Sequence, residues 1–166
     1  MNDRIAALDW PAIAASLWAR GWATTGPLLS AAECAALRES YDDEARFRAR
    51  VVMARHRFGE GEYKYFGRPV PPLVTAVREA SYARLAPIAR DWNQALDTDS
   101  DFPDAHAGFI DRCRAHGQTR PTPLLLRYAT GGYNCLHQDL YGDEVFPLQV
   151  AILLSEPGGT SRAASS

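Results

Sequence analysis

The chain has 166 residues, of which 46% are hydrophobic and 23% are charged, and its formal net charge is −2. This length suits one domain, while the composition excludes wholesale disorder and gives no global attraction to nucleic acid or anionic membrane. No apolar run approaches the ~18 residues that span a bilayer, and the N-terminus lacks the features of a signal peptide, so we expect no membrane partner.

Capping signals predict two helices near the N-terminus. Asp9 can cap a helix over residues 10–20, in which apolar side chains recur on one face. Ser30 and Glu33 form a capping-box pattern, which predicts a second helix that runs to about residue 41.

The middle of the chain predicts a hairpin and two more helices. Residues 51–53 and 63–66 have strand character and flank a glycine-containing turn at 59–61. A long helix is predicted over 71–96, with a kink or break at Pro87. A further helix is predicted over 104–116 and ends before Gly117.

Strand patterns replace helical ones from about residue 118. We expect strands over 124–128 and 133–139, joined by a Gly131-Gly132 turn. Residues 145–154 form a nearly continuous apolar run, which favours a strand buried on both faces. The expected fold class is α+β, with a helical part over 1–117 and the beginning of a β-core over 118–158.

The motif His137-Gln138-Asp139 carries the clearest chemistry. Side chains alternate along a strand, so His137 and Asp139 would share one face while Gln138 points away. An imidazole and a carboxylate at this spacing are two of the three ligands in the 2-His-1-carboxylate triad of non-haem Fe(II) oxygenases. The same pattern also occurs as an ordinary polar pair on an edge strand.

The surrounding residues strengthen the metal interpretation. The string from Arg127-Tyr128 through Gly131 and Tyr133 to His137-Gln-Asp139 has the form R-Y-x-x-G-x-x-Y-x-x-H-x-D. It resembles the prolyl-hydroxylase-like branch of the Fe(II)/2-oxoglutarate dioxygenases. Together with the continuation His-Gln-Asp-Leu-Tyr-Gly, it is similar to a bacterial 2-oxoglutarate/Fe(II) oxygenase family described as acting on alkylated DNA. The resemblance covers nearly all of residues 15–158.

The resemblance implies a fold, a set of cofactors and roles for four residues. The helices would pack on an incomplete double-stranded β-helix, a jelly-roll or cupin-like core, within a single domain over 1–158. His137 and Asp139 would ligate Fe(II), while Tyr128 would contact 2-oxoglutarate and Tyr133 would line the pocket. O2 would be the second co-substrate, ascorbate a candidate reductant, and damaged DNA or RNA a candidate substrate. The reaction would be oxidative hydroxylation or demethylation.

The C-terminal residues depart from the family pattern. The resemblance implies a second iron histidine downstream, followed by an Arg or Lys that binds 2-oxoglutarate, but no histidine or strand pattern follows Gly158. Family members continue with Asp-Phe-Thr-Gly-Gly-Glu-Phe, which a G/C-rich back-translation of 160–166 encodes after a one-base shift. We therefore expect 159–166 to be an out-of-frame tail, and the chain as written to be inactive and aggregation-prone.

Three cysteines, an odd number at unhelpful spacings, predict a reducing cytoplasm rather than a disulfide framework. Cys113, His116, Cys135 and His137 could instead form a zinc site that stabilises a non-catalytic binding module. Cys135 with His137 could also suggest a cysteine hydrolase, but no orienting group follows them.

A basic and aromatic run offers a nucleic-acid surface. Such residues suit a bound nucleic-acid strand, although arginine-rich solvated faces over core aromatics are the commoner explanation of such a run. Its cations are Arg46, Arg48, Arg50, Arg55, Arg57, Lys64 and Arg68, and its aromatic residues are Phe47, Phe58, Tyr63, Tyr65 and Phe66. His56 and His106 are assigned no role.

Overall fold

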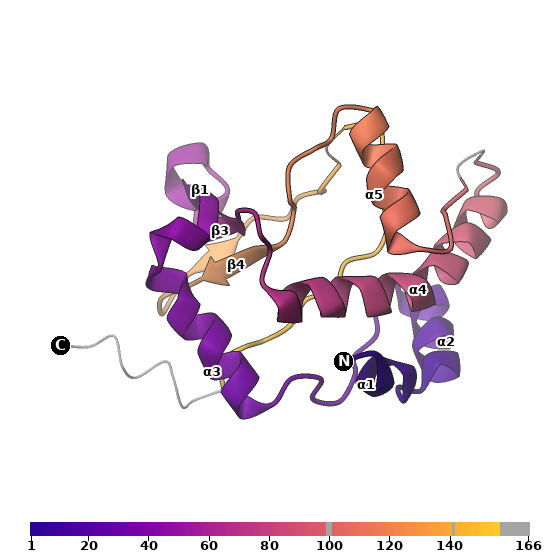
Figure 1. The fold of residues 1–166 in the computed structure, drawn as a ribbon, viewed down its shortest axis with the longest axis horizontal. Coiled ribbons are helices and arrows are strands. Elements are labelled where there is room, and N and C mark those ends of the chain that lie inside the picture. Colours follow the sequence, from indigo (N-terminus) through magenta and orange to yellow (C-terminus); the bar gives the residue numbers. More distant parts are fainter. Residues whose placement is uncertain (99–100, 141, 157–166) are drawn as a thin grey trace. The chain divides into compact units, whose positions relative to one another are not determined.

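The computed structural model describes residues 1–98, 101–140 and 142–156 (Figure 1). They fall into two compact units, the first made of residues 1–28, 71–119 and 142–150, and the second of residues 29–70, 120–140 and 151–156. The predicted out-of-frame tail at 159–166 lies outside the described residues. The assignment of one domain to 1–158 stays a prediction.

The first unit is helical. Its helices are α1 (Asn2–Ala6), α2 (Trp10–Arg20), α4 (Pro72–Ala95) and α5 (His106–Ala115). The Asp9 carboxylate accepts a hydrogen bond from the Ala12 amide at 3.0 Å, which confirms the predicted cap of α2. No helix among the described residues is long and apolar enough to cross a membrane.

The long helix α4 continues through Pro87, so the predicted break is wrong. Proline removes one backbone hydrogen bond, but packing of the buried face of this helix holds the two halves in one element. Figure 1 shows α4 changing direction part-way along its length, as the kink prediction requires.

Aromatic rings form the core between α4 and α5. Tyr82, Phe102 and Phe109 are buried, and Phe146 packs on all three with ring centroids 5.0–5.8 Å apart. Leu148 packs against the same cluster.

The strand predicted over 145–154 is therefore wrong. Gln118 clamps the start of the segment, because its side-chain amide donates to the Glu144 carbonyl at 2.9 Å and its carbonyl accepts from the Glu144 amide at 2.8 Å. The apolar run thus packs partly against helices, whereas a strand needs a neighbouring strand to pair its backbone groups. Val150 and Leu153 are exposed, which also contradicts burial on both faces.

The second unit is a mixture of short helices and antiparallel strands. The helix α3 (Ala31–Glu39) begins with the predicted capping box, in which Ser30 and Glu33 exchange side-chain to backbone bonds. Three short 3-10 helices follow: η1 (Ser40–Asp42), η2 (Glu44–Arg46) and η3 (Met53–His56). The described parts of both units together confirm an α+β class.

Two small sheets complete this unit. In the first, β1 (Phe47–Val52), β3 (Glu62–Phe66) and β4 (Leu124–Arg127) pair antiparallel in the order β1-β3-β4. In the second, β2 (Gly59–Glu60) pairs with β5 (Tyr133–Asn134). The predicted hairpin and the strand after residue 124 are thus confirmed, but residues 135–139 are not a strand, because the pairing with β2 ends at Asn134.

Truncating the aromatic core should strongly destabilise the protein. Phe109→Ala should lower the free energy of unfolding by about 3–5 kcal/mol, since it removes a buried ring and leaves a cavity. Chemical denaturation measures the change, and Leu96→Ala, at an exposed position, is the control. Equal stability of the two variants would contradict the packing described here.

Candidate active site

The two-residue ladder between β2 and β5 positions the segment that carries the His-x-Asp motif. Gly59 pairs with Asn134 and Glu60 with Tyr133. Cys135 extends the contact, because its amide donates to the Phe58 carbonyl at 2.7 Å and its thiol donates to the Arg57 carbonyl at 3.6 Å. Residues 57–60 and 133–135, far apart in the sequence, are therefore held side by side.

This close approach requires glycine at two positions. Gly59 has φ +129°, and a Cβ atom there would lie 2.2 Å from the Tyr133 carbonyl oxygen. Gly61 has φ +152°, and its Cβ would lie 2.6 Å from Cδ1 of the Tyr128 ring. Both the backbone conformation and the available space thus exclude a side chain.

His137 and Asp139 lie side by side although they are not on a strand. The His137 Nε2 atom is 3.6 Å from Asp139 Oδ1, and the two side chains are 47% and 39% exposed. The structure therefore brings together the two predicted ligands on irregular backbone rather than by strand alternation.

The histidine is oriented by a backbone hydrogen bond. His137 Nδ1 lies 2.7 Å from the Cys135 carbonyl oxygen, which can only accept, so Nδ1 carries a proton. In the neutral ring, Nε2 is then a lone pair facing the Asp139 carboxylate. Nε2 is therefore the ring nitrogen that is available to a metal ion. Metal-binding histidines commonly donate their other nitrogen in this way.

The two predicted cofactor-binding tyrosines flank the same ladder. Tyr128 is 41% exposed and its ring lies against the backbone of Gly61. Tyr133 is 55% exposed and contributes its backbone to the pairing with Glu60. Their contact with 2-oxoglutarate stays a prediction.

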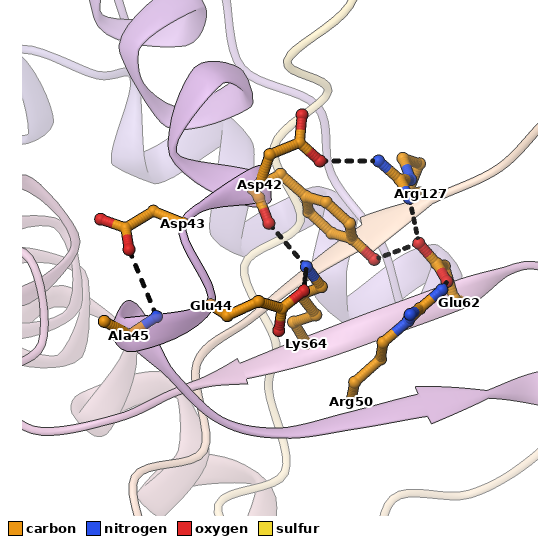
Figure 2. Close-up of polar contacts among 9 residues, drawn as sticks. Asp42, Asp43, Glu44, Ala45, Arg50, Glu62, Lys64 and Arg127 are labelled. Atoms are coloured by element: carbon orange, nitrogen blue, oxygen red, sulfur yellow. Dashed lines mark hydrogen bonds and ion pairs between the residues drawn. The ribbon is translucent and has the colours of Figure 1, made fainter.

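A charged network, which sequence reasoning missed, fixes the end of β4 directly before Tyr128 (Figure 2). Glu62 is largely buried and accepts hydrogen bonds from Tyr41 at 3.1 Å and from Arg50 Nε at 2.8 Å. Arg127 lies 2.5 Å from the same carboxylate and also pairs with Asp42 at 3.2 Å. The sequence did contain a signal for this network, since the acidic Glu62 lies within the basic run of residues 46–68 and could be expected to pair with its cations.

The network changes the acidity of its members. Burial opposes ionisation of Glu62, but hydrogen bonds from Arg50, Tyr41 and Arg127 outweigh it and hold its pKa below the ordinary value. Burial, followed by the hydrogen bond to Glu62, raises the pKa of Tyr41. Glu62 is therefore a carboxylate and Tyr41 a neutral donor at neutral pH.

Lys64, the lysine assigned to the basic run, is buried beneath this network. Its ammonium donates to the Tyr41 carbonyl and to Glu44, both at 2.7 Å, and lies 4.4 Å from the centroid of the Tyr41 ring. Its side chain is 3% exposed, so it stabilises the unit rather than facing a ligand.

The two alternative sites gain no support. Among the described residues, no group of three or more His, Cys, Asp and Glu side chains is placed to hold a metal ion. Cys113 is buried in the aromatic core, where burial raises its thiol pKa, and His116 pairs with Glu144 at 3.2 Å. The Cys135 thiol donates to a carbonyl, and the contact of His137 with Cys135 is to its backbone, which gives no activated nucleophile.

Comparison with known proteins defines the class. Residues 61–162, more than half of the chain, match a family described as an oxygenase catalysing oxidative methylation of damaged DNA. The chain belongs to this oxygenase family, whose match covers β3, β5 and the His137–Asp139 pair.

The chain is also similar to two curated proteins of Mycobacterium tuberculosis. They are "Uncharacterized protein MT2286" of strain CDC 1551 and "Uncharacterized protein Rv2227" of strain H37Rv, each 46% identical over 92 residues. Those residues are 55% of this chain and 40% of each relative, so the chain spans less than half the length of these proteins. No solved structure matches significantly.

A methyl group at Gly59 should open the ladder. Gly59→Ala would place Cβ against the Tyr133 carbonyl and force an unfavourable φ, at a cost of about 1–3 kcal/mol. Hydrogen exchange of the Cys135 amide, bonded to Phe58 in the native structure, should accelerate. Gly26→Ala, which has open space around its Cβ, is the control. Unchanged exchange in Gly59→Ala would contradict the ladder.

Neutralising Glu62 should lower stability at neutral pH and reduce acid sensitivity. Glu62→Gln weakens charge-assisted hydrogen bonds, at a cost of roughly 1–3 kcal/mol. Because the folded-state pKa of Glu62 lies below 4.5, its stabilisation is present above about pH 4.5 and is lost as the pH falls through the folded pKa.

Denaturation curves at several pH values between about 3 and about 7, a range that includes the titration of carboxylates, measure this effect. Glu60→Gln, which removes an exposed carboxylate next to Gly61, is the matched control. A parallel pH dependence in the wild-type protein and Glu62→Gln would show that Glu62 does not contribute.

Proposed function

We propose that the chain forms part of a non-haem Fe(II)- and 2-oxoglutarate-dependent dioxygenase that oxidises damaged nucleic acid. Membership of the oxygenase family supports oxygenase chemistry, and the family description supports damaged DNA as the substrate class. In this proposal the antiparallel sheets of the second unit begin a double-stranded β-helix.

The geometry of His137 is the observation that carries the proposal. Its Nδ1 proton is committed to the Cys135 carbonyl at 2.7 Å, and its Nε2 atom faces Asp139 at 3.6 Å. This leaves one nitrogen and one oxygen donor close together, both about half-exposed. An ordinary hydrogen-bonded pair would be closer, at about 2.7–3.2 Å.

The two donors fit a divalent first-row metal. Such ions bind imidazole nitrogen and carboxylate oxygen at about 2.0–2.2 Å, so two ligands of one ion lie at most about 4.4 Å apart. The observed 3.6 Å satisfies this limit. The third protein ligand of a facial triad is not among the described residues near the pair.

Each residue would have a separate task in the reaction. When bound, Fe(II) with 2-oxoglutarate and O2 supplies the oxidising power that attacks a substrate C–H bond. His137 and Asp139 would hold the ion, and the bond to the Cys135 carbonyl would keep the imidazole in the ligating tautomer. Tyr128 would orient the carboxylate of 2-oxoglutarate through its hydroxyl, and Tyr133 would line the pocket. Hydroxylation and demethylation both begin with oxidation of such a bond.

Removing either donor should weaken metal binding. His137→Ala and Asp139→Ala should each lower the affinity for Fe(II), added without oxygen, by at least about tenfold, because one ligand of the ion is lost. Calorimetric titration measures the affinity, and circular dichroism verifies that each variant is folded. His56→Ala, which removes another exposed histidine, should bind as the wild-type protein does. Equal affinity of all three variants would refute the assignment of the pair.

A further inference from the structure

The structure divides the basic run of residues 46–68 into cations that are engaged and cations that are not. Five have partners: Arg46 pairs with Asp43, Arg48 lies over the Tyr65 ring and donates to Pro121, Arg50 pairs with Glu62, Lys64 is buried, and Arg68 also has a contact. These residues maintain the fold. The nucleic-acid surface expected from the sequence is thus much smaller than the run itself.

Arg55 and Arg57 are the exception. Both are exposed, and within the described part of the chain neither guanidinium has a hydrogen-bond, ion-pair or ring partner. Arg57 adopts a left-handed backbone conformation with φ +60° at the end of η3. Two unpaired positive charges therefore lie two residues apart on one short turn.

The same turn carries an exposed aromatic pair. His56 stacks on Phe58, with ring centroids 5.4 Å apart and an angle of 24° between the planes. Phe58 remains 45% exposed. A stacked ring pair that is exposed on the same turn as two unpaired arginines suits a ligand with flat rings and negative charge.

This turn is joined to the candidate metal ligands through one residue. Cys135 donates its amide to the Phe58 carbonyl at 2.7 Å and its thiol to the Arg57 carbonyl at 3.6 Å. The Cys135 carbonyl in turn accepts the His137 Nδ1 proton at 2.7 Å. A ligand bound to the turn is thereby held near His137.

We propose that residues 55–58 form a binding platform for a single nucleic-acid strand, which presents a nucleotide to the His137–Asp139 pair. Arg55 and Arg57 bind successive phosphates, and an unpaired base stacks on the His56–Phe58 pair. The inference rests on the proposed function for the identity of the site that it serves. It also assigns His56 a role that the sequence did not indicate.

Two properties favour a single strand over other anionic partners. Bases are available for stacking on side chains only when they are unpaired, whereas a duplex offers mainly its phosphates to a surface turn. An acidic peptide or an anionic membrane would use the arginines but not a stacked aromatic pair. The net charge of −2 gives no global attraction to polyanions, so the attraction must be local.

The binding test uses metal-free protein in the presence of a chelator, so that it does not depend on iron or on turnover. Fluorescence anisotropy follows a labelled oligothymidylate of about 12 nucleotides, a length within the range of single-strand sites, over a series of salt concentrations. Arg55→Gln with Arg57→Gln should weaken binding and reduce the slope of log affinity against log salt by about 1.4, or about 0.7 per phosphate contact. Arg46→Gln, whose cation is already paired with Asp43, should leave the slope unchanged.

Stacking is tested separately from charge. Phe58→Leu should weaken binding at least about fivefold, whereas Phe58→Tyr should retain the wild-type affinity. An abasic strand of the same length and a duplex should both bind more weakly than the oligothymidylate. Circular dichroism confirms that the variants are folded.

Contrary results would overturn the proposal. It fails if the double arginine variant and Arg46→Gln have the same salt slope, if Phe58→Leu binds as tightly as Phe58→Tyr, or if abasic strand, duplex or anionic vesicles bind as well as the oligothymidylate. Loss of metal binding in His137→Ala with intact strand binding would support both proposals. Strand binding by these residues without any metal binding would refute the iron assignment alone.

Discussion

The pairing of β2 with β5 is the constraint on which the candidate site depends. It consists of two residue pairs, Gly59 with Asn134 and Glu60 with Tyr133, continued by the Cys135 amide. So short a ladder contributes little stability by itself, but it joins segments more than seventy residues apart in the sequence. Glycine at position 59 makes the approach possible, because the Tyr133 carbonyl occupies the space of a Cβ atom. The orientation of His137 then follows from its bond to Cys135.

Electrostatics inside the second unit determines which charges remain available for ligands. Glu62 is the centre of this arrangement, because it pairs with both Arg50 and Arg127. Lys64 instead donates hydrogen bonds to Glu44 and to the Tyr41 carbonyl. A buried cation is tolerated only when it is paired, so the contacts to Glu44 and to the Tyr41 carbonyl are what allow Lys64 to be buried. Arginines that are paired within the unit, such as Arg50 and Arg127, are not available to bind a ligand. Arg55 and Arg57, which precede β2, are the cations of the run that stay available for a ligand, and a count of basic residues could not have identified them.

Local signals were sufficient to predict α2, α3, α4 and α5, though not the single-turn α1 or the 3-10 helices, whereas the strands depended on partners that the sequence does not specify. Asp9 and the Ser30–Glu33 box cap their helices through contacts within four residues, and both were predicted. The apolar run beginning at Val145 has strand composition, yet Phe146 joins the aromatic core of the helices instead. Likewise, the strand predicted through residue 139 ends at Asn134, because β2 is only two residues long. The spacing of apolar residues in a sequence predicts which side chains will be buried, but it does not identify the residues against which they pack.

The His137–Asp139 pair shows why a motif can be useful even when the secondary structure inferred for it is wrong. Strand alternation was the reason for expecting the two side chains on one side, and residues 135–139 form no strand. The side chains are nevertheless 3.6 Å apart, because a spacing of two residues allows an irregular backbone to bring them together as well. What distinguishes the pair from two adjacent polar groups is the commitment of the Nδ1 proton to a backbone carbonyl. That bond leaves Nε2, which lies 3.6 Å from the Asp139 carboxylate, as the ring nitrogen that is available to a ligand.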